Sequence, residues 1–114
     1  VPNWRDPLVA AFSPADGAED VSRGTAVTVT WSQAMVANTC LTLTGPAGAV
    51  AGTCSYDDAT FTVTFTPAQP LRGGTLYTAL VSGQVDAGGD TQQVPVTWTF
   101  TTAPVLLYLP VIGR

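Results

Sequence analysis

The sequence contains no lysine and no histidine, and its four arginines are scattered at Arg5, Arg23, Arg72 and Arg114. Binding to the phosphates of a nucleic acid needs clustered positive charge. The scattered arginines and the net charge of -4 therefore argue against a nucleic-acid partner. The same shortage argues against electrostatic docking on an anionic membrane. The lack of histidine removes the commonest general base and metal ligand, which weighs against an enzyme.

Carboxylates offer little catalytic chemistry in place of histidine. The adjacent acidic pairs, Glu19-Asp20 and Asp57-Asp58, both fall in expected connecting segments, where such pairs usually form turns. We therefore expect a non-enzymatic protein without a cofactor. A weak calcium site stays open as an alternative, because loops at one end of a sandwich could supply carboxylate oxygens. The residues concerned are Asp57, Asp58, Asp86 and Asp90, whose spacing does not match an EF-hand.

The chain has few charged residues of either sign, 11% in all, against 46% hydrophobic residues. Such a chain is too apolar for a disordered segment, and 114 residues supply a single domain with one core. Threonine is frequent, and 11 glycines and 9 prolines punctuate the threonine-rich runs. Threonine favours strands, while glycine and proline favour turns. A threonine-rich surface without lysine predicts an extracellular or cell-surface protein.

Apolar and polar residues alternate along most of the chain. Val27, Val29 and Trp31 share one face of an expected strand, with threonines on the other face, which is the period of a half-buried strand. The last strand is expected to turn Val94 and Val96 inward together with its aromatic residues. Because no segment has helical periodicity, we predict an all-β antiparallel sandwich of about seven strands. The strands are expected at residues 8–12, 25–31, 40–44, 60–66, 75–81 and 94–102, with another through Cys54.

The two cysteines lie on either side of a turn at residues 45–48. If this turn closes a hairpin, Cys40 and Cys54 are symmetric about it and face each other across two antiparallel strands. We expect a disulfide there, stapling the outer surface of the hairpin and contributing roughly 3 kcal/mol in the chain-entropy model. A structural zinc site would need more ligands than this pair supplies.

Several motifs occur in order along residues 8–102. They are Ser13-Pro14-Ala15-Asp16-Gly17-Ala18, the Val27-x-Val29-x-Trp31 strand, Met35, Thr62-Val63-Thr64-Phe65-Thr66-Pro67, Leu71-x-Gly73-Gly74-Thr75-x-Tyr77, Asp86-Ala87-Gly88-Gly89 and Trp98-Thr99-Phe100-Thr101-Thr102. With these motifs the chain resembles the bacterial Ig-like domain, which is common in S-layer and other cell-surface proteins. The resemblance implies an Ig-like sandwich and a spacer or assembly module without a shared active site. The cysteine pair and the C-terminal tail depart from the family's usual pattern.

The tail is the most hydrophobic run in the sequence. We divide the chain into a leader (1–7), the Ig-like sandwich (8–102) and this tail (103–114). About eight apolar residues are too few for a transmembrane helix, which needs about 20, but extended they span about 26 Å, the length of a strand. The residues of this extra C-terminal strand are Val105, Leu106, Leu107, Tyr108, Leu109, Val111 and Ile112.

Three destinations are open for the tail: its own domain, a neighbouring copy, or export and anchoring machinery that reads it as a tag. Strand addition to a neighbour joins two different surfaces, so it propagates head to tail into a filament. We predict a structural subunit of an extracellular filament or surface layer, whose partners are copies of itself. The alternative is a monomeric adhesion or binding module, with contacts to glycans or the cell envelope.

Overall fold

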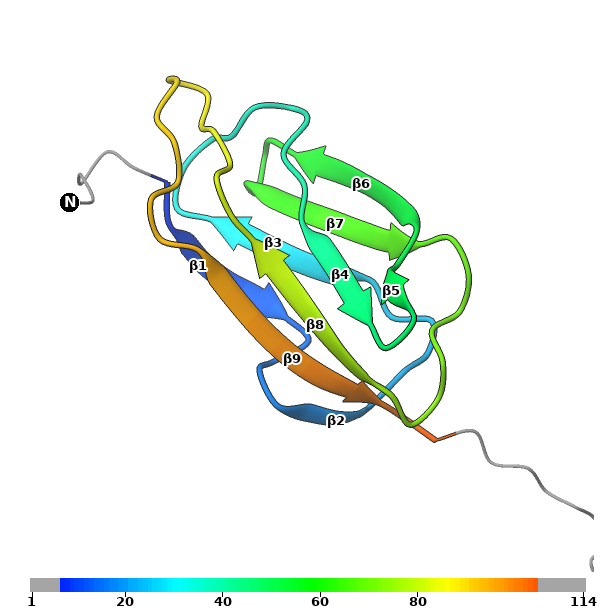
Figure 1. The fold of residues 1–114 in the computed structure, drawn as a ribbon. Coiled ribbons are helices and arrows are strands. Elements are labelled where there is room, and N and C mark those ends of the chain that lie inside the picture. The colour runs from blue at the N-terminus through cyan, green and yellow to red at the C-terminus, as the bar shows by residue number, and fades with distance from the viewer. Residues whose placement is uncertain (1–6, 105–114) are drawn as a thin grey trace, which may run out of the picture.

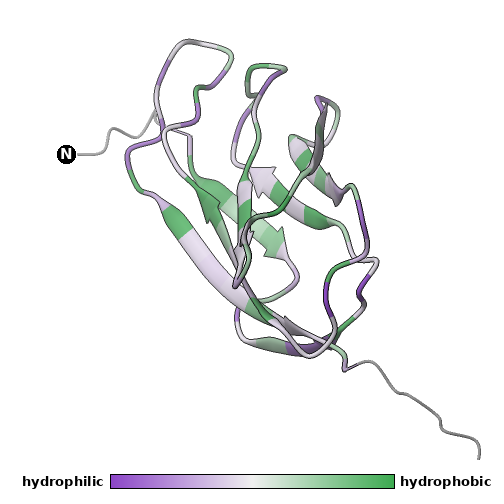
Figure 2. Cartoon of the chain, turned by 45° about the vertical axis from the view of Figure 1, so that its right-hand side comes forward, coloured by the Kyte–Doolittle hydropathy of each residue, from purple (hydrophilic) through white to green (hydrophobic). Residues whose placement is uncertain are grey.

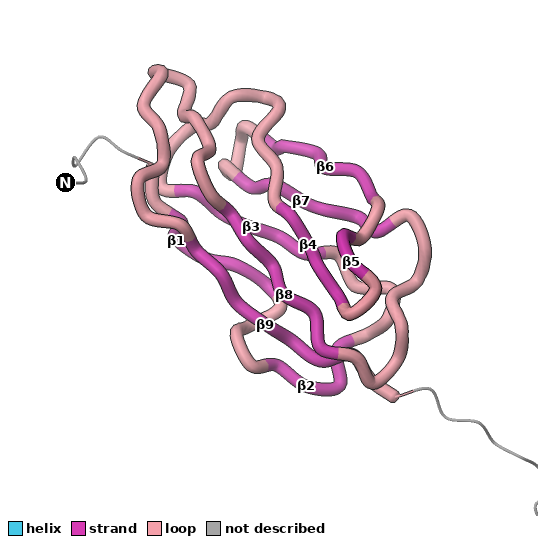
Figure 3. The backbone as a smooth tube through the Cα atoms, in the orientation of Figure 1, coloured by secondary structure: helices cyan, strands magenta, loops and turns pink. Residues whose placement is uncertain are grey.

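The computed structural model describes residues 7–104, which form nine strands in two sheets packed face to face (Figure 1). The strands are β1 (Val9–Ser13), β2 (Ala18–Val21), β3 (Val27–Trp31), β4 (Thr42–Gly45), β5 (Gly48–Ala49), β6 (Gly52–Asp57), β7 (Thr62–Pro67), β8 (Leu76–Val81) and β9 (Val96–Thr102). Strands and loops make up all of this part of the chain (Figure 3), and within it no helix is long and apolar enough to cross a membrane.

The four-stranded sheet has the order β1-β3-β7-β6 and is antiparallel throughout. The five-stranded sheet has the order β2-β9-β8-β4-β5, in which β2 runs parallel to β9 and the other pairs are antiparallel. The predicted all-β sandwich is therefore confirmed, with one parallel pair and with more strands in the described residues than the seven expected.

The core lies between the sheets and follows the alternation seen in the sequence (Figure 2). On β3, Val27, Val29 and Trp31 are at most 2% exposed, while the threonines between them are half-buried. Trp98 on β9 faces them, and its ring stacks on Phe12 with the centroids 4.1 Å apart. Burying each such side chain contributes roughly 1.5–3 kcal/mol before entropy costs, so these residues hold the sheets together.

Two expectations along the strands are wrong. Glu19 and Asp20 belong to β2 rather than to a loop, because this acidic segment pairs with β9 at the edge of the sheet, where both side chains stay exposed. Val94 is 46% exposed instead of facing the core. Two positions before Val94, Gln92 is buried, and its side-chain amide donates hydrogen bonds to the carbonyls of Val81 and Val94.

The hairpin predicted between the cysteines is also wrong. The chain does turn back after β4, at residues 45–48, but the strand that returns is the two-residue β5, while the other edge of β4 pairs with β8. The chain then crosses to the other sheet, where Cys54 on β6 lies opposite Phe65 on β7. Symmetry about the turn therefore does not place the cysteines on paired strands.

Candidate assembly surfaces

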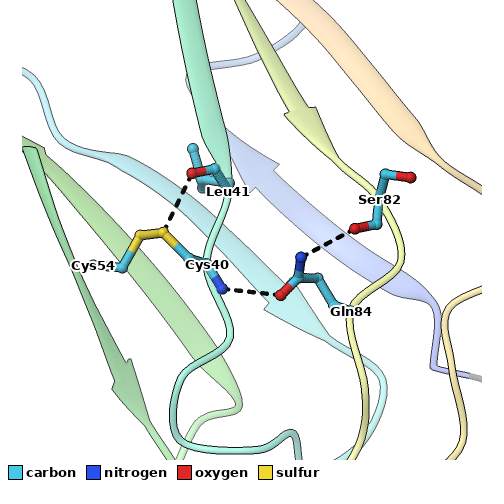
Figure 4. The surroundings of a disulfide bond; sticks show 5 residues. All are labelled: Cys40, Leu41, Cys54, Ser82 and Gln84. Carbon is cyan, nitrogen blue, oxygen red and sulfur yellow. Dashed lines mark hydrogen bonds between the residues drawn. A yellow bond between two sulfur atoms is a disulfide. The ribbon is translucent and has the colours of Figure 1, made fainter. Parts of the chain in front are cut away.

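The disulfide between Cys40 and Cys54 joins the two sheets (Figure 4). Cys40 precedes β4 of the five-stranded sheet and Cys54 lies on β6 of the four-stranded sheet, with their Cα atoms 5.6 Å apart. Both residues are half-buried. The backbone N–H of Cys40 donates to Oε1 of Gln84 at 3.1 Å, and the Gln84 amide in turn donates to the carbonyl of Ser82. The disulfide thus acts as a clamp, in the sense of a covalent link between the two sheets, and does not join two strands of one hairpin.

The opposite side of the sandwich is bridged by the chain itself. Strand β1 belongs to the four-stranded sheet, and β2, which follows it, belongs to the five-stranded sheet. A backbone hydrogen bond of 2.7 Å from Gly17 to the carbonyl of Thr99 holds this crossing against β9. Both sides of the core are therefore closed by the domain's own residues. A strand donated by another molecule would meet the outside of the sandwich.

The loops at one end of the sandwich are tied together around a buried carboxylate. Asp86, only 4% exposed, accepts backbone hydrogen bonds at Oδ1 from Gly88 (2.9 Å) and Asp90 (2.8 Å). Its Oδ2 accepts from Nε2 of Gln33 in the β3–β4 loop. A bridge between Met35 and Asp86 pairs the same two loops through the backbone. Through these hydrogen bonds Asp86 holds the β3–β4 loop and the β8–β9 loop together.

The four aspartates considered for calcium divide between two segments. Asp57 and Asp58 lie at the β6–β7 turn, where Asp57 accepts a hydrogen bond from the backbone N–H of Ala59. Asp86 and Asp90 lie in the β8–β9 loop, and the Asp86 carboxylate is already occupied by N–H donors. Within residues 7–104 no three histidine, cysteine or acidic residues form a group that could hold a metal ion.

The end of β9 fixes the point at which the chain leaves the sandwich. The N–H of Ala103 donates to the carbonyl of Val21 at 2.8 Å, and the carbonyl of Ala103 accepts from Gly74 at 3.0 Å. Gly74 has φ +58°, and a Cβ there would lie 3.7 Å from Cα of Pro104. The backbone is therefore held on both sides as far as Ala103. The predicted assembly strand, residues 105–112, lies outside the described residues.

The chain enters and leaves the sandwich at opposite ends (Figure 1). Strand β1 begins at the end that carries the β8–β9 loop, whereas β9 ends beside β2 and the start of β8. The last described residues therefore lie at the end of the sandwich opposite to the start of β1.

A shallow cleft of about 220 Å³ lies near this exit, between Arg23–Gly24 on one side and residues 66–70 on the other. Arg23 is fixed at the cleft by two bonds to Leu71: its Nε donates to the Leu71 carbonyl at 2.7 Å, and its own carbonyl accepts from the Leu71 N–H. The cleft is lined by a cation together with proline and alanine residues.

Two leucines missed by the sequence analysis project from the outer face of β8. Leu76 is 56% exposed and Leu80 is 41% exposed, while Tyr77, Ala79 and Val81 between and beside them are buried. Because β8 is apolar at almost every position, alternation could not tell its inward face from its outward face. Only the packing of Tyr77 against Phe100, with ring centroids 6.0 Å apart, identifies the inward face.

A sequence profile of the bacterial Ig-like domain matches residues 5–102. No curated protein sequence matches the chain. Among solved structures, the CopC protein of Methylosinus trichosporium OB3b superposes with a TM-score of 0.67 at 14% identity, covering 90% of this chain and 99% of that one. Domains 1–6 of the surface layer protein SbsC superpose with a TM-score of 0.61 at 20% identity.

The match to SbsC covers 88% of this chain but spans only 14% of the SbsC chain. An L,D-transpeptidase from Mycobacterium smegmatis is also similar, with a TM-score of 0.59 at 20% identity, and is covered over 40% of its length. At these identities the likeness is one of fold. The same sandwich thus occurs both as a small protein of this size and as one module of a longer chain.

Proposed function

Because the chain belongs to the bacterial Ig-like domain family, we propose that it is a non-enzymatic structural subunit of an extracellular filament or surface layer. Copies join head to tail, each adding its C-terminal strand to the next. The S-layer likeness and the disulfide both favour a location at the cell surface or outside the cell, because disulfides persist in oxidising compartments.

The observation that carries this proposal is the way the chain leaves a sandwich that is already closed. The core is filled by residues of the strands and of the loops between them, and the backbone is anchored as far as Ala103, at the end opposite to the start of β1. The core of the described residues is thus filled without the apolar residues that follow Pro104 in the sequence. Apolar side chains in that position gain by burial against another molecule.

Deleting residues 104–114 tests the connection. We expect the shortened protein to stay folded, since the core keeps all its strands, and to sediment as a monomer in which electron microscopy detects no filaments. A full-length variant with Leu107→Asp and Leu109→Asp is the matched control for chain length, and it should behave in the same way. Filaments formed by the shortened protein would show that the tail is not the connector.

A monomeric adhesion or binding module is the second candidate, and the cleft beside Arg23 favours it. In this case the protein is a monomer with or without its tail, and it binds a glycan or a component of the cell envelope. Sedimentation of the full-length protein separates the two candidates, since only the first predicts a mass that rises with concentration.

A further inference from the structure

The outer face of β4, β8 and β9 carries two exposed leucines, and the charged residues of this sheet, the exposed Glu19 and Asp20, lie on its edge strand β2. Strands β4, β8 and β9 contain no charged residue. In the register of the sheet, Leu80 lies between Thr42 and Thr97, and Leu76 lies next to Thr101. Among the described residues the large hydrophobic side chains that are most exposed are Leu8, Leu76, Leu80 and Val94, and the two on β8 share one face of one strand.

We propose that this face, centred on Leu76 and Leu80, is the acceptor surface for residues 105–112 of a neighbouring copy. The inference rests on the proposed function, and adds to it the place where the tail binds. The tail carries no charge before Arg114, and strands β4, β8 and β9 carry none, so contact with these three strands does not strip the hydration of a charged group. Leu76 and Leu80 are four positions apart along the strand, roughly 13 Å, and an extended tail of about 26 Å covers both.

A neighbour's tail fits this face better than the chain's own tail does. Strand β9 runs antiparallel to β8, and Leu80 lies opposite Thr97, near the start of β9. The chain therefore leaves β9 in the direction away from Leu80. To cover Leu80, its own tail would have to reverse direction directly after Ala103, and the turn would consume its first apolar residues. The tail of a copy placed before this one needs no reversal, because it arrives from the end nearest to Leu80.

Binding across the face also suits the tail better than pairing along a sheet edge. Pro110 interrupts the tail and has no N–H to donate, so a ladder of backbone hydrogen bonds along residues 105–112 would be broken at that residue. Contacts between side chains do not need that donor. Val105, Leu107, Leu109 and Val111 share one parity, so they can face the leucines together.

Replacing both leucines by threonine in the full-length protein tests the acceptor surface. Threonine already occupies the neighbouring positions and favours strands, so the double variant Leu76→Thr/Leu80→Thr should fold with its melting temperature little changed. We expect its association, measured by sedimentation over a range of concentrations, to weaken about tenfold or more, because large apolar contacts are lost. The matched control is Leu8→Thr/Val94→Thr, which removes the other two exposed apolar side chains and should associate like the unmodified protein.

Three outcomes would overturn the inference. If the β8 double variant associates normally while the tail deletion does not, the tail binds elsewhere and the proposed function stands. If the control variant weakens association as much as the β8 variant, the effect is not specific to this face. If the full-length protein is a monomer whose tail becomes sensitive to protease only after the β8 substitutions, the face binds its own tail, and the head-to-tail proposal fails with it.

Discussion

Asp86 is the buried acidic residue of the described chain, and its environment explains why a carboxylate is kept there. Two backbone N–H groups of its own loop and the amide of Gln33 from the neighbouring loop all point at its two oxygens. A buried charge is tolerated when its hydrogen bonds are satisfied, and the same bonds fix the shape of both loops. An acidic residue that could be suspected of binding a metal ion thus has a structural role.

Asp86→Ala should destabilise the protein by on the order of 2 kcal/mol, because three N–H donors lose their acceptor in a buried place. Asp57→Ala is the matched control: this carboxylate also accepts a backbone N–H two residues ahead, but it is exposed, and its loss should cost less than about 1 kcal/mol. Urea unfolding followed by tryptophan fluorescence measures both. Equal losses would contradict the role given to Asp86.

Gly52 at the start of β6 has no room for a side chain. A Cβ there would lie 2.5 Å from the carbonyl oxygen of Thr66 and 2.6 Å from Cζ of Phe65. Gly52→Ala should therefore destabilise the domain by about 1–3 kcal/mol through overpacking. Gly24→Ala, where the nearest atom is 3.9 Å away, serves as the control and should change the unfolding free energy by less than about 1 kcal/mol. Thermal unfolding of the two variants decides between these expectations.

At the scale of elements, the positions of the strands could be predicted from the sequence more completely than the way the strands pair with one another. Alternation located β3 and β7, because Val27, Val29 and Val63 leave threonines on the opposite face. It could not find β2, whose four residues include Glu19 and Asp20 and show no period of two. Nor could it show that β6 joins β7 and not β4, since a half-buried strand has the same pattern in either sheet.

Of the two proposed assembly surfaces, the C-terminal tail could be found from the sequence and the leucine face of β8 could not. The tail was evident from composition, because its apolar run follows the last strand of a complete sandwich. The leucines on β8 were not, because Leu76 and Tyr77 are both apolar and only the packing decides which of them faces inward. The disulfide between Cys40 and Cys54 was predicted from their symmetry about the turn at residues 45–48, but the bond links two sheets, which depends on where the chain crosses.

The disulfide links two elements that share no ladder, so it should matter to the stability of the whole sandwich. Replacing both cysteines by serine is expected to cost roughly 3 kcal/mol, the chain entropy of closing a loop with a sequence separation of 14. Urea unfolding of the double variant measures this cost, and the unmodified protein unfolded with a reductant should give a similar value. A loss below about 1 kcal/mol would mean that the clamp contributes little.

At the scale of the whole molecule, the described residues form a closed sandwich in which β1 begins and β9 ends at opposite poles (Figure 1). Donor and acceptor are different surfaces in the assembly proposed above, so each copy has one of each and contacts propagate in a line. A copy without its tail keeps the acceptor but has nothing to donate. Such a copy can bind the tail of the last subunit of a filament. Because it has no tail to donate to a further subunit, the filament stops growing at that end.

Mixing full-length protein with the copy that lacks residues 104–114 tests this polarity most directly. Electron microscopy of assemblies grown with increasing fractions of the shortened copy should show filaments that become progressively shorter, with labelled shortened copies confined to one end. Filaments of unchanged length that exclude the shortened copy, or that carry it along their whole length, would contradict head-to-tail assembly through the C-terminal strand.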